Sequence, residues 1–341
     1  MNRKTVSVML ALIVLIFACS KADMNLPFSG FINPAHFPQP VYKFANNPVT
    51  KDGFELGRRL FYEPRLSRDN SISCGSCHIQ SSAFTQHGHD VSHGIDDRLG
   101  RRNSPPIMNL AWMPNYMWDG GIFDLDLQPI NPITAHEEMD ESVANVISKL
   151  QDHPDYPALF KKAYGSETIT TATFMKSLSQ FMLMCISSNS KYDSVIQKLG
   201  NTQFTDEEAA GYKLVQQKCG SCHAEPLFTD NSFRNNGIGT GLNDDPGRYE
   251  ATLNETDRYK FKVPSLRNLA YTAPYMHDGR YYRLDAVLAH YNSTVQHTPN
   301  LDPVLINGGI PMTAQEQQQI LAFLNTLNDK NFISDKLLSE Q

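Results

Sequence analysis

The chain has 341 residues, which is enough for two domains of about 150 residues that each bury a core, so a single small module is excluded. Its 30 Lys and Arg against 36 Asp and Glu give a formal net charge of -6, and the basic residues form no block. A nucleic-acid partner is not expected, because clustered cations supply most of such affinity.

The amino terminus has the pattern of a secretion signal. Two basic residues precede an apolar run over 6–18 that is too short to span a bilayer. The run ends at Cys19 in a sequence that resembles a bacterial lipobox, where that cysteine would carry lipid; ordinary cleavage near Ala18 or Ala22 is the alternative. We expect a signal peptide over 1–18, a periplasmic protein and, through lipid on Cys19, attachment to a membrane surface.

The pentapeptide Cys-Gly-Ser-Cys-His occurs twice, at 74–78 and at 219–223. In a C-x-x-C-H motif, two thiols bond the vinyl groups of a porphyrin and the next histidine reaches its iron. The sequence therefore predicts two haems c. The residues expected to hold them are Cys74, Cys77, His78, Cys219, Cys222 and His223. A zinc site built from the four thiolates is the alternative, but it leaves the repeated histidine unexplained.

Helices are predicted from the spacing of apolar residues and from capping signals. They cover 52–62, 143–150, 174–185 and the segments that follow Thr205 and Thr313. The last two open with capping boxes. Cys185 shares the apolar spacing of its helix, which indicates a buried structural thiol. Because no segment alternates as a strand does, the predicted fold class is all-α with long loops.

A repeat lies downstream of each motif. Residues 109–120 align without gaps onto residues 268–279, and seven of the twelve positions are identical. A match of this length indicates two related halves. We therefore expect two cytochrome c-like domains related by duplication, over 24–200 and 201–335, each with one haem.

The offset of 159 residues between the repeats places Tyr291 opposite Pro132, with His290 as the neighbour of Tyr291. If this stretch faces the iron, the second haem meets a ligand and the first meets a proline that cannot coordinate. One iron would be closed and the other open, as peroxide chemistry requires. Met117 and Met276 are also thioether candidates, but they match across the halves, which favours a packing role.

These features together resemble the bacterial di-haem cytochrome c peroxidases and their MauG-type relatives, over nearly the whole chain after the signal. Besides the haem motifs, the resemblance rests on G-R-R-L-F at 57–61, R-N-S-P at 102–105, W-D-G at 118–120, F-K-V-P-S-L-R-N at 261–268 and P-Y-M-H-D-G at 274–279. It implies an oxidoreductase that acts on peroxide, with the first haem as the peroxidatic one.

The resemblance also implies roles for single residues. The family has a glutamine and a glutamate ten residues apart after W-D-G, and Gln128 and Glu138 hold those positions here. Glu138 would move a proton from the near to the leaving oxygen of peroxide; the sequence alone favours a charge at a helix amino terminus. Trp118 resembles the tryptophan between the haems, which can relay an electron. The residues that match the family's calcium position are Asn103, Thr272 and Pro274.

Two positions depart from the cytochrome c peroxidases. Their second haem usually takes a methionine where this chain has Tyr291, and a tyrosine there resembles the MauG-type enzymes. The histidine that closes the resting first haem in many peroxidases is replaced by Ile95. His87, His89 and His93 lie near enough in the loop to substitute, but we expect an open first haem.

Three functions follow from this sequence. The leading one is a peroxidase that reduces hydrogen peroxide to water with electrons from a small cytochrome c or cupredoxin, entering at the second haem. A MauG-type enzyme that oxidises aromatic residues of a partner protein is favoured by Tyr291. A di-haem electron carrier is disfavoured by Pro132 and Glu138, because a carrier gains nothing from an open iron beside a carboxylate. The family also suggests a homodimer.

Overall fold

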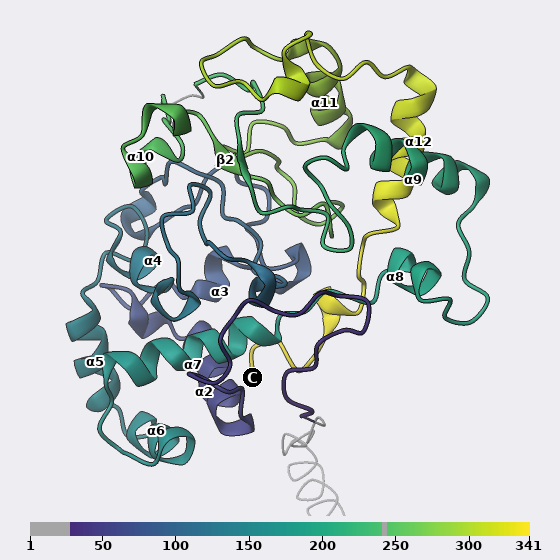
Figure 1. The fold of residues 1–341 in the computed structure, drawn as a ribbon. Coiled ribbons are helices and arrows are strands. Elements are labelled where there is room, and N and C mark those ends of the chain that lie inside the picture. The colour runs from purple at the N-terminus through teal and green to yellow at the C-terminus, as the bar shows by residue number, and fades with distance from the viewer. Residues whose placement is uncertain (1–27, 241–243) are drawn as a thin grey trace, which may run out of the picture.

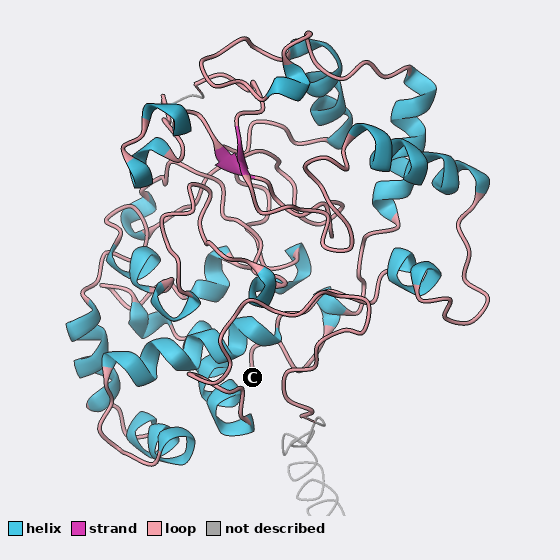
Figure 2. Cartoon of the chain, in the orientation of Figure 1, coloured by secondary structure: helices cyan, strands magenta, loops and turns pink. Residues whose placement is uncertain are grey.

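The computed structural model describes residues 28–240 and 244–341; the expected signal peptide and Cys19 lie outside them. The chain is mostly helical, with long loops and a two-stranded ribbon (Figures 1 and 2). Its helices and strands are α2 (Lys51–Phe61), α3 (Cys74–Cys77), α4 (Ile130–Thr134), α5 (Val143–Gln151), α6 (Tyr156–Tyr164), α7 (Thr171–Met184), α8 (Lys191–Ile196), α9 (Asp206–Lys218), β1 (Phe233–Arg234), α10 (Tyr249–Thr252), β2 (Phe261–Lys262), α11 (Leu284–Ala289) and α12 (Ala314–Asn325). No helix of the described residues is long and apolar enough to cross a membrane.

The first hydrophobic core forms where α2 packs against α7, in the lower half of the molecule in Figure 1. Gly57 allows the close approach, because a Cβ there would lie 1.9 Å from the backbone oxygen of Ser177. The ring of Phe181 lies 4.7 Å from that of Phe61, centroid to centroid. This core supports the loops that follow the first C-x-x-C-H motif.

The second core forms where α9 packs against α12, in the upper half. Gly211 allows this contact, since a Cβ there would lie 1.9 Å from the backbone oxygen of Gln319. Both helices begin at the capping boxes expected at Thr205 and Thr313. In each half, therefore, the helix that leads into a haem motif packs on a second helix through a glycine.

The end of the chain returns from the second half to the first. In Figure 1 the yellow segment after α12 runs down beside α2 and α7. Arg58 donates to the backbone oxygen of Leu337 at 2.7 Å, and the Tyr62 hydroxyl donates to that of Leu338 at 2.9 Å. Phe332 packs within the first core. The last residues thus bind the two halves together.

The helices expected from the sequence are confirmed as α2, α5, α7, α9 and α12. Cys185 is buried and carries a free thiol, as expected. The expectation that no strand occurs was wrong at one place, where β1 pairs antiparallel with β2. Two residues per strand are too few to show alternation in a sequence.

Candidate haem-binding sites

The first C-x-x-C-H motif lines a cavity of 620 Å³. The short helix α3 places Cys74 and Cys77 on one wall, and His78 follows directly, its backbone N–H donating to the oxygen of Cys74 at 2.9 Å. Both thiols are free. The donors of one haem c are thus gathered at one cavity wall.

A backbone carbonyl orients each motif histidine. The Nδ1 of His78 donates to the oxygen of Phe84 at 2.8 Å, and the Nδ1 of His223 lies 3.1 Å from the oxygens of both Phe228 and Pro264. Carbonyl partners require a proton on Nδ1, which leaves Nε2 as the coordinating nitrogen. Burial lowers the pKa of His78 and of His223, so both rings are held in the neutral form that binds metals.

The first cavity is also lined by the residues expected on the distal side. Glu138, Gln128 and Pro132 all line it. Burial raises the pKa of Glu138, and within the described residues its carboxylate has one hydrogen-bond donor, the Ser92 hydroxyl at 3.5 Å. The Gln128 amide donates to the sulfur of Met117 at 3.7 Å. Glu138 is thus a partly buried carboxyl group whose environment disfavours the charge.

The three loop histidines differ in position. His93 lines the first cavity, whereas His87 and His89 do not. His89 is exposed and its ring centroid lies 4.3 Å from that of His93, and His87 bonds the Ser82 hydroxyl at 3.0 Å. Ile95 is buried and lines neither main cavity. Of the three, His93 alone is near the first haem site.

The second motif lines a cavity of 210 Å³ with Cys219, Cys222 and His223. Tyr291 also lines this cavity, and burial raises the pKa of its phenol to about 12. The Asn236 amide lies 3.5 Å from the Tyr291 hydroxyl. Tyr291 therefore lines the second cavity, and Pro132, its counterpart at the offset of 159, lines the first.

His290 does not line that cavity and bonds neighbouring groups. Its Nε2 lies 3.0 Å from the backbone oxygen of Asn236, and its Nδ1 lies 3.3 Å from the Thr294 hydroxyl. Met276 does line the cavity, with the Asn236 amide 3.6 Å from its sulfur. Between the neighbours 290 and 291, then, the tyrosine is the one directed at the second site.

The repeated segments share their local conformation. The Tyr116 hydroxyl donates to the oxygen of Leu110, and the Tyr275 hydroxyl donates to that of Leu269. Each tyrosine also forms a bridge six residues downstream. The residues that adopt positive φ at matching positions are Asn109 and Asn268, Met117 and Met276, and Gly120 and Gly279. The offset of 159 read from the sequence thus holds in hydrogen bonds and backbone angles.

Six described residues line both cavities and form the wall between them. They are Asn103, Pro106, Trp118, Lys262, Pro264 and Ser265. The indole Nε1 of Trp118 donates to the backbone oxygen of Asn103 at 2.8 Å, which fixes the ring in this wall. Asn103, Thr272 and Pro274, the residues of the expected calcium position, all line the second cavity.

Sequence reasoning missed two polar residues at these sites. Lys262 lies in the wall, where burial lowers its pKa to about 8, and its Nζ donates to the oxygen of Asn115 at 3.0 Å. His277 lines the second cavity at the position that matches Trp118, and its Nε2 has no partner among the described residues. A lysine within the apolar run F-K-V-P was the signal that could have revealed the first.

The donor sets fit two haems c. Each cavity offers two free thiols and a neutral histidine whose Nδ1 is already bonded, which is the chemistry of covalent attachment and axial ligation. Among the described residues, no group of three or more His, Cys, Asp or Glu side chains could hold a metal ion by itself. The zinc alternative therefore has no support in this part of the chain.

Known proteins are similar to this chain in sequence and in fold. The profile of the family described as di-haem cytochrome c peroxidase matches residues 51–201. The chain is 34% identical to the methylamine utilization protein MauG of Methylorubrum extorquens, over 90% of this chain and 86% of that protein. It is 32% identical to the cytochrome c551 peroxidase of Nitrosomonas europaea, over 85% and 83%. A crystal structure of a MauG-like protein associated with microbial copper homeostasis matches with a TM-score of 0.79 and 31% identity, over 90% and 97%.

Proposed function

Because the chain belongs to the di-haem cytochrome c peroxidase family and is an oxidoreductase of the peroxidase type, we propose that it reduces hydrogen peroxide to water with electrons from a small donor protein. Membership of this family implies two haems c. The observation that carries the proposal is the asymmetry of the two cavities: Pro132 and Glu138 line the first, and Tyr291 lines the second. The first site can accept a small oxidant, and the second is closed by a side chain.

The two sites belong, in this proposal, to two cytochrome c-like domains related by duplication, with a boundary near residue 200. The matching hydrogen bonds of Tyr116 and Tyr275 support the duplication. The two hydrophobic cores, each under one motif, support the division. Tyr192 of α8 packs in the second core, so this helix, although it precedes residue 200, contacts the second domain.

When bound in the first cavity, a haem supplies the redox-active iron at which peroxide is cleaved. The chain's own part is to move protons. Glu138 in its ionised form takes the proton from one peroxide oxygen, and the resulting neutral carboxyl group, which burial favours, returns it to the other oxygen so that the leaving group departs as water. Gln128 offers an amide in the same cavity to orient the oxidant. Complete reduction uses two electrons and two protons and yields two waters.

Electrons enter at the second site and cross the wall between the cavities. Trp118 supports this route, because its indole lines both cavities and is fixed by its bond to Asn103. A small cytochrome c or cupredoxin is the class of donor that we propose. The signal pattern over 1–18 supports a periplasmic location, with lipid on Cys19 as the attachment to a membrane surface. We also propose calcium at Asn103, Thr272 and Pro274.

A MauG-type activity, which would oxidise aromatic residues of a partner protein, is the second candidate. The direction of Tyr291 into the second cavity favours it, because an oxygen ligand lowers the potential of an iron that a thioether would raise. The same observation is compatible with a peroxidase, since the ligand sets the potential rather than the substrate. A di-haem carrier is not favoured, because Glu138 and Pro132 line a cavity that a carrier does not need.

One comparison separates the candidates. The holoprotein is given hydrogen peroxide with either a reduced small cytochrome c or an extract of periplasmic proteins. Rapid oxidation of the cytochrome, without mass change in any other protein, is the result that we expect. Mass changes in a partner without cytochrome oxidation would favour the MauG-type activity, and no peroxide consumption in either mixture would leave only the carrier.

A further inference from the structure

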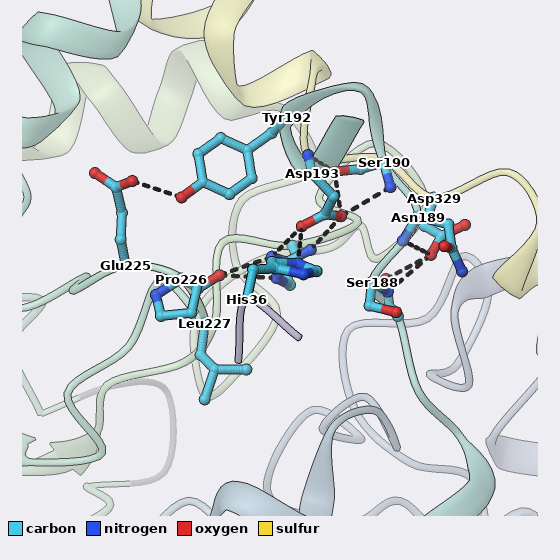
Figure 3. Close-up of polar contacts among 12 residues, drawn as sticks. His36, Ser188, Asn189, Ser190, Tyr192, Asp193, Glu225, Pro226, Leu227 and Asp329 are labelled. Carbon is cyan, nitrogen blue, oxygen red and sulfur yellow. Dashed lines mark hydrogen bonds and ion pairs between the residues drawn. The ribbon is translucent and has the colours of Figure 1, made fainter. Parts of the chain in front are cut away.

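A buried ion pair joins three distant segments beside the second haem motif. The guanidinium of Arg267 donates to both carboxylate oxygens of Asp193, at 2.7 and 2.9 Å, and both side chains are at most 1% exposed. His36, from the segment ahead of α2, lies with its Nε2 2.8 Å from the same carboxylate (Figure 3). The backbone and hydroxyl of Ser190 complete the contacts of Asp193.

Arg267 also holds the backbone of the loop that follows His223. Its Nε and Nη2 donate to the oxygen of Pro226, at 3.1 and 2.7 Å. Two residues further on, the oxygen of Phe228 accepts from the Nδ1 of His223. Because Pro226 and Phe228 are in one short loop, fixing the first carbonyl restrains the second.

The other carbonyl partner of His223 is restrained through the same arginine. Pro264, whose oxygen lies 3.1 Å from the Nδ1 of His223, is three residues ahead of Arg267 in one segment. The Ser265 hydroxyl between them donates to the oxygen of Leu227 at 2.6 Å, which ties that segment to the loop again. Arg267 thus connects the two backbone segments, 226–228 and 264–267, whose carbonyl groups contact the Nδ1 of His223.

In the part of the chain that the structure describes, the first site has no such arrangement. The offset of 159 places Met108 at the position of Arg267, and a thioether can neither pair with a carboxylate nor hold a carbonyl. His78 correspondingly has one carbonyl partner, Phe84, where His223 has two. The two histidines therefore differ in their outer contacts as well as in what stands opposite them.

We propose that His36, Asp193 and Arg267 are positioning residues that keep two carbonyl acceptors on the Nδ1 of His223 and thereby hold the second haem at a lower potential. The inference rests on the proposed function, in which His223 is an iron ligand. An imidazole whose N–H is well bonded is a more basic ligand, and a more basic ligand stabilises the oxidised iron.

His36 makes this arrangement depend on the segment ahead of α2. A carboxylate only accepts, so the Nε2 of His36 carries the proton, and its buried Nδ1 has no partner among the described residues. The hydrogen bond to Asp193 is therefore the polar contact that holds the His36 ring in place. Without this bond, Asp193 still pairs with Arg267, but its Oδ1 loses the hydrogen bond from His36. The position of the Arg267 side chain is then less restrained.

The test is a redox titration of the purified holoprotein, followed by absorption, with the second haem assigned by its low-spin EPR signal. Arg267→Lys keeps the charge but cannot bond two carboxylate oxygens and a carbonyl together. We expect an upward shift of the second midpoint potential and no shift of the first. Tyr156→Phe is the matched control, because it removes a buried side-chain bond, to Glu63 at 2.7 Å, in the first half.

A second pair of variants guards against loss of folding in Arg267→Lys. His36→Leu removes the donor to Asp193, whereas His36→Gln retains an N–H that can reach it. The potential should rise in His36→Leu and return toward the wild-type value in His36→Gln. An unchanged second potential in folded Arg267→Lys, or equal potentials in the two His36 variants, would overturn the inference. A wild-type protein without two haems c would instead overturn the proposed function itself.

Discussion

Pro132 and Tyr291 stand at equivalent positions, 159 residues apart, and each lines the cavity of its own half. One ring cannot coordinate a metal and the other carries a phenol. The same protein scaffold therefore presents two environments to two haems. This difference, more than the haem motifs that both halves share, supports the division of labour that we propose.

Replacing Glu138 with Gln should slow the reaction with peroxide by about 10² or more, because an amide cannot exchange the proton that a carboxyl group moves. Stopped-flow mixing of the holoprotein with peroxide measures this rate. Glu137→Gln is the matched control, since that neighbouring carboxylate is exposed. Equal rates in wild type and Glu138→Gln would reduce Glu138 to a charge near a helix.

The same variant should change stability in a pH-dependent way. Burial raises the pKa of Glu138, so its ionisation opposes folding once the pH rises from the usual carboxyl range, about 4.3, through the raised pKa. Glu138→Gln should therefore match the wild-type melting temperature near pH 4 and exceed it increasingly toward pH 7. Thermal unfolding across this range gives the answer. A gain that does not vary with pH would contradict the raised pKa.

Replacing Trp118 with Phe should slow electron transfer between the two sites, because the less oxidisable ring removes the relay in the wall. The other tryptophan provides the control: the Nε1 of Trp112 donates to the oxygen of Pro38 at 2.8 Å, but its ring lines neither main cavity. Each variant should lose about 1 kcal/mol of stability with its hydrogen bond. Turnover with a reduced cytochrome should fall in Trp118→Phe alone. An equal fall in Trp112→Phe would contradict the role of Trp118 as an electron relay.

Replacing Tyr291 with Met should raise the midpoint potential of the second haem, because a thioether favours the reduced iron more than an oxygen ligand does. His290→Gln should leave that potential nearly unchanged, since His290 does not line the second cavity and its two nitrogens bond the backbone oxygen of Asn236 and the Thr294 hydroxyl. Redox titration of the two variants compares them directly. A shift in His290→Gln with none in Tyr291→Met would show that the neighbouring residues had been assigned in the wrong order.

The sequence predicted five of the described helices, α2, α5, α7, α9 and α12, and it contains both haem motifs; the reasons are local. Capping boxes at Thr205 and Thr313 act within one turn, and the C-x-x-C-H motif needs only five adjacent residues. The asymmetry between Pro132 and Tyr291 was also readable, because a duplication supplies its own alignment.

Other features depend on geometry that the sequence does not contain. Which of His290 and Tyr291 faces the iron depends on the phase of a helix that changes from α11 to a π-helical turn at His290–Thr294. Arg267 pairs with Asp193 across 74 residues, so no local pattern announces the contact. The C-terminal tail packs on the first half because its apolar residues find a partner there, which only the folded chain reveals.

EPR spectroscopy of the oxidised holoprotein at low temperature tests the central claim most directly, because it reports the coordination of each iron separately. We predict one high-spin ferric signal, from an open first site beside Pro132, and one low-spin signal, from a second site closed by Tyr291. Two low-spin signals that persist when peroxide is added would show both irons capped by side chains, and would contradict a peroxide site in the first cavity.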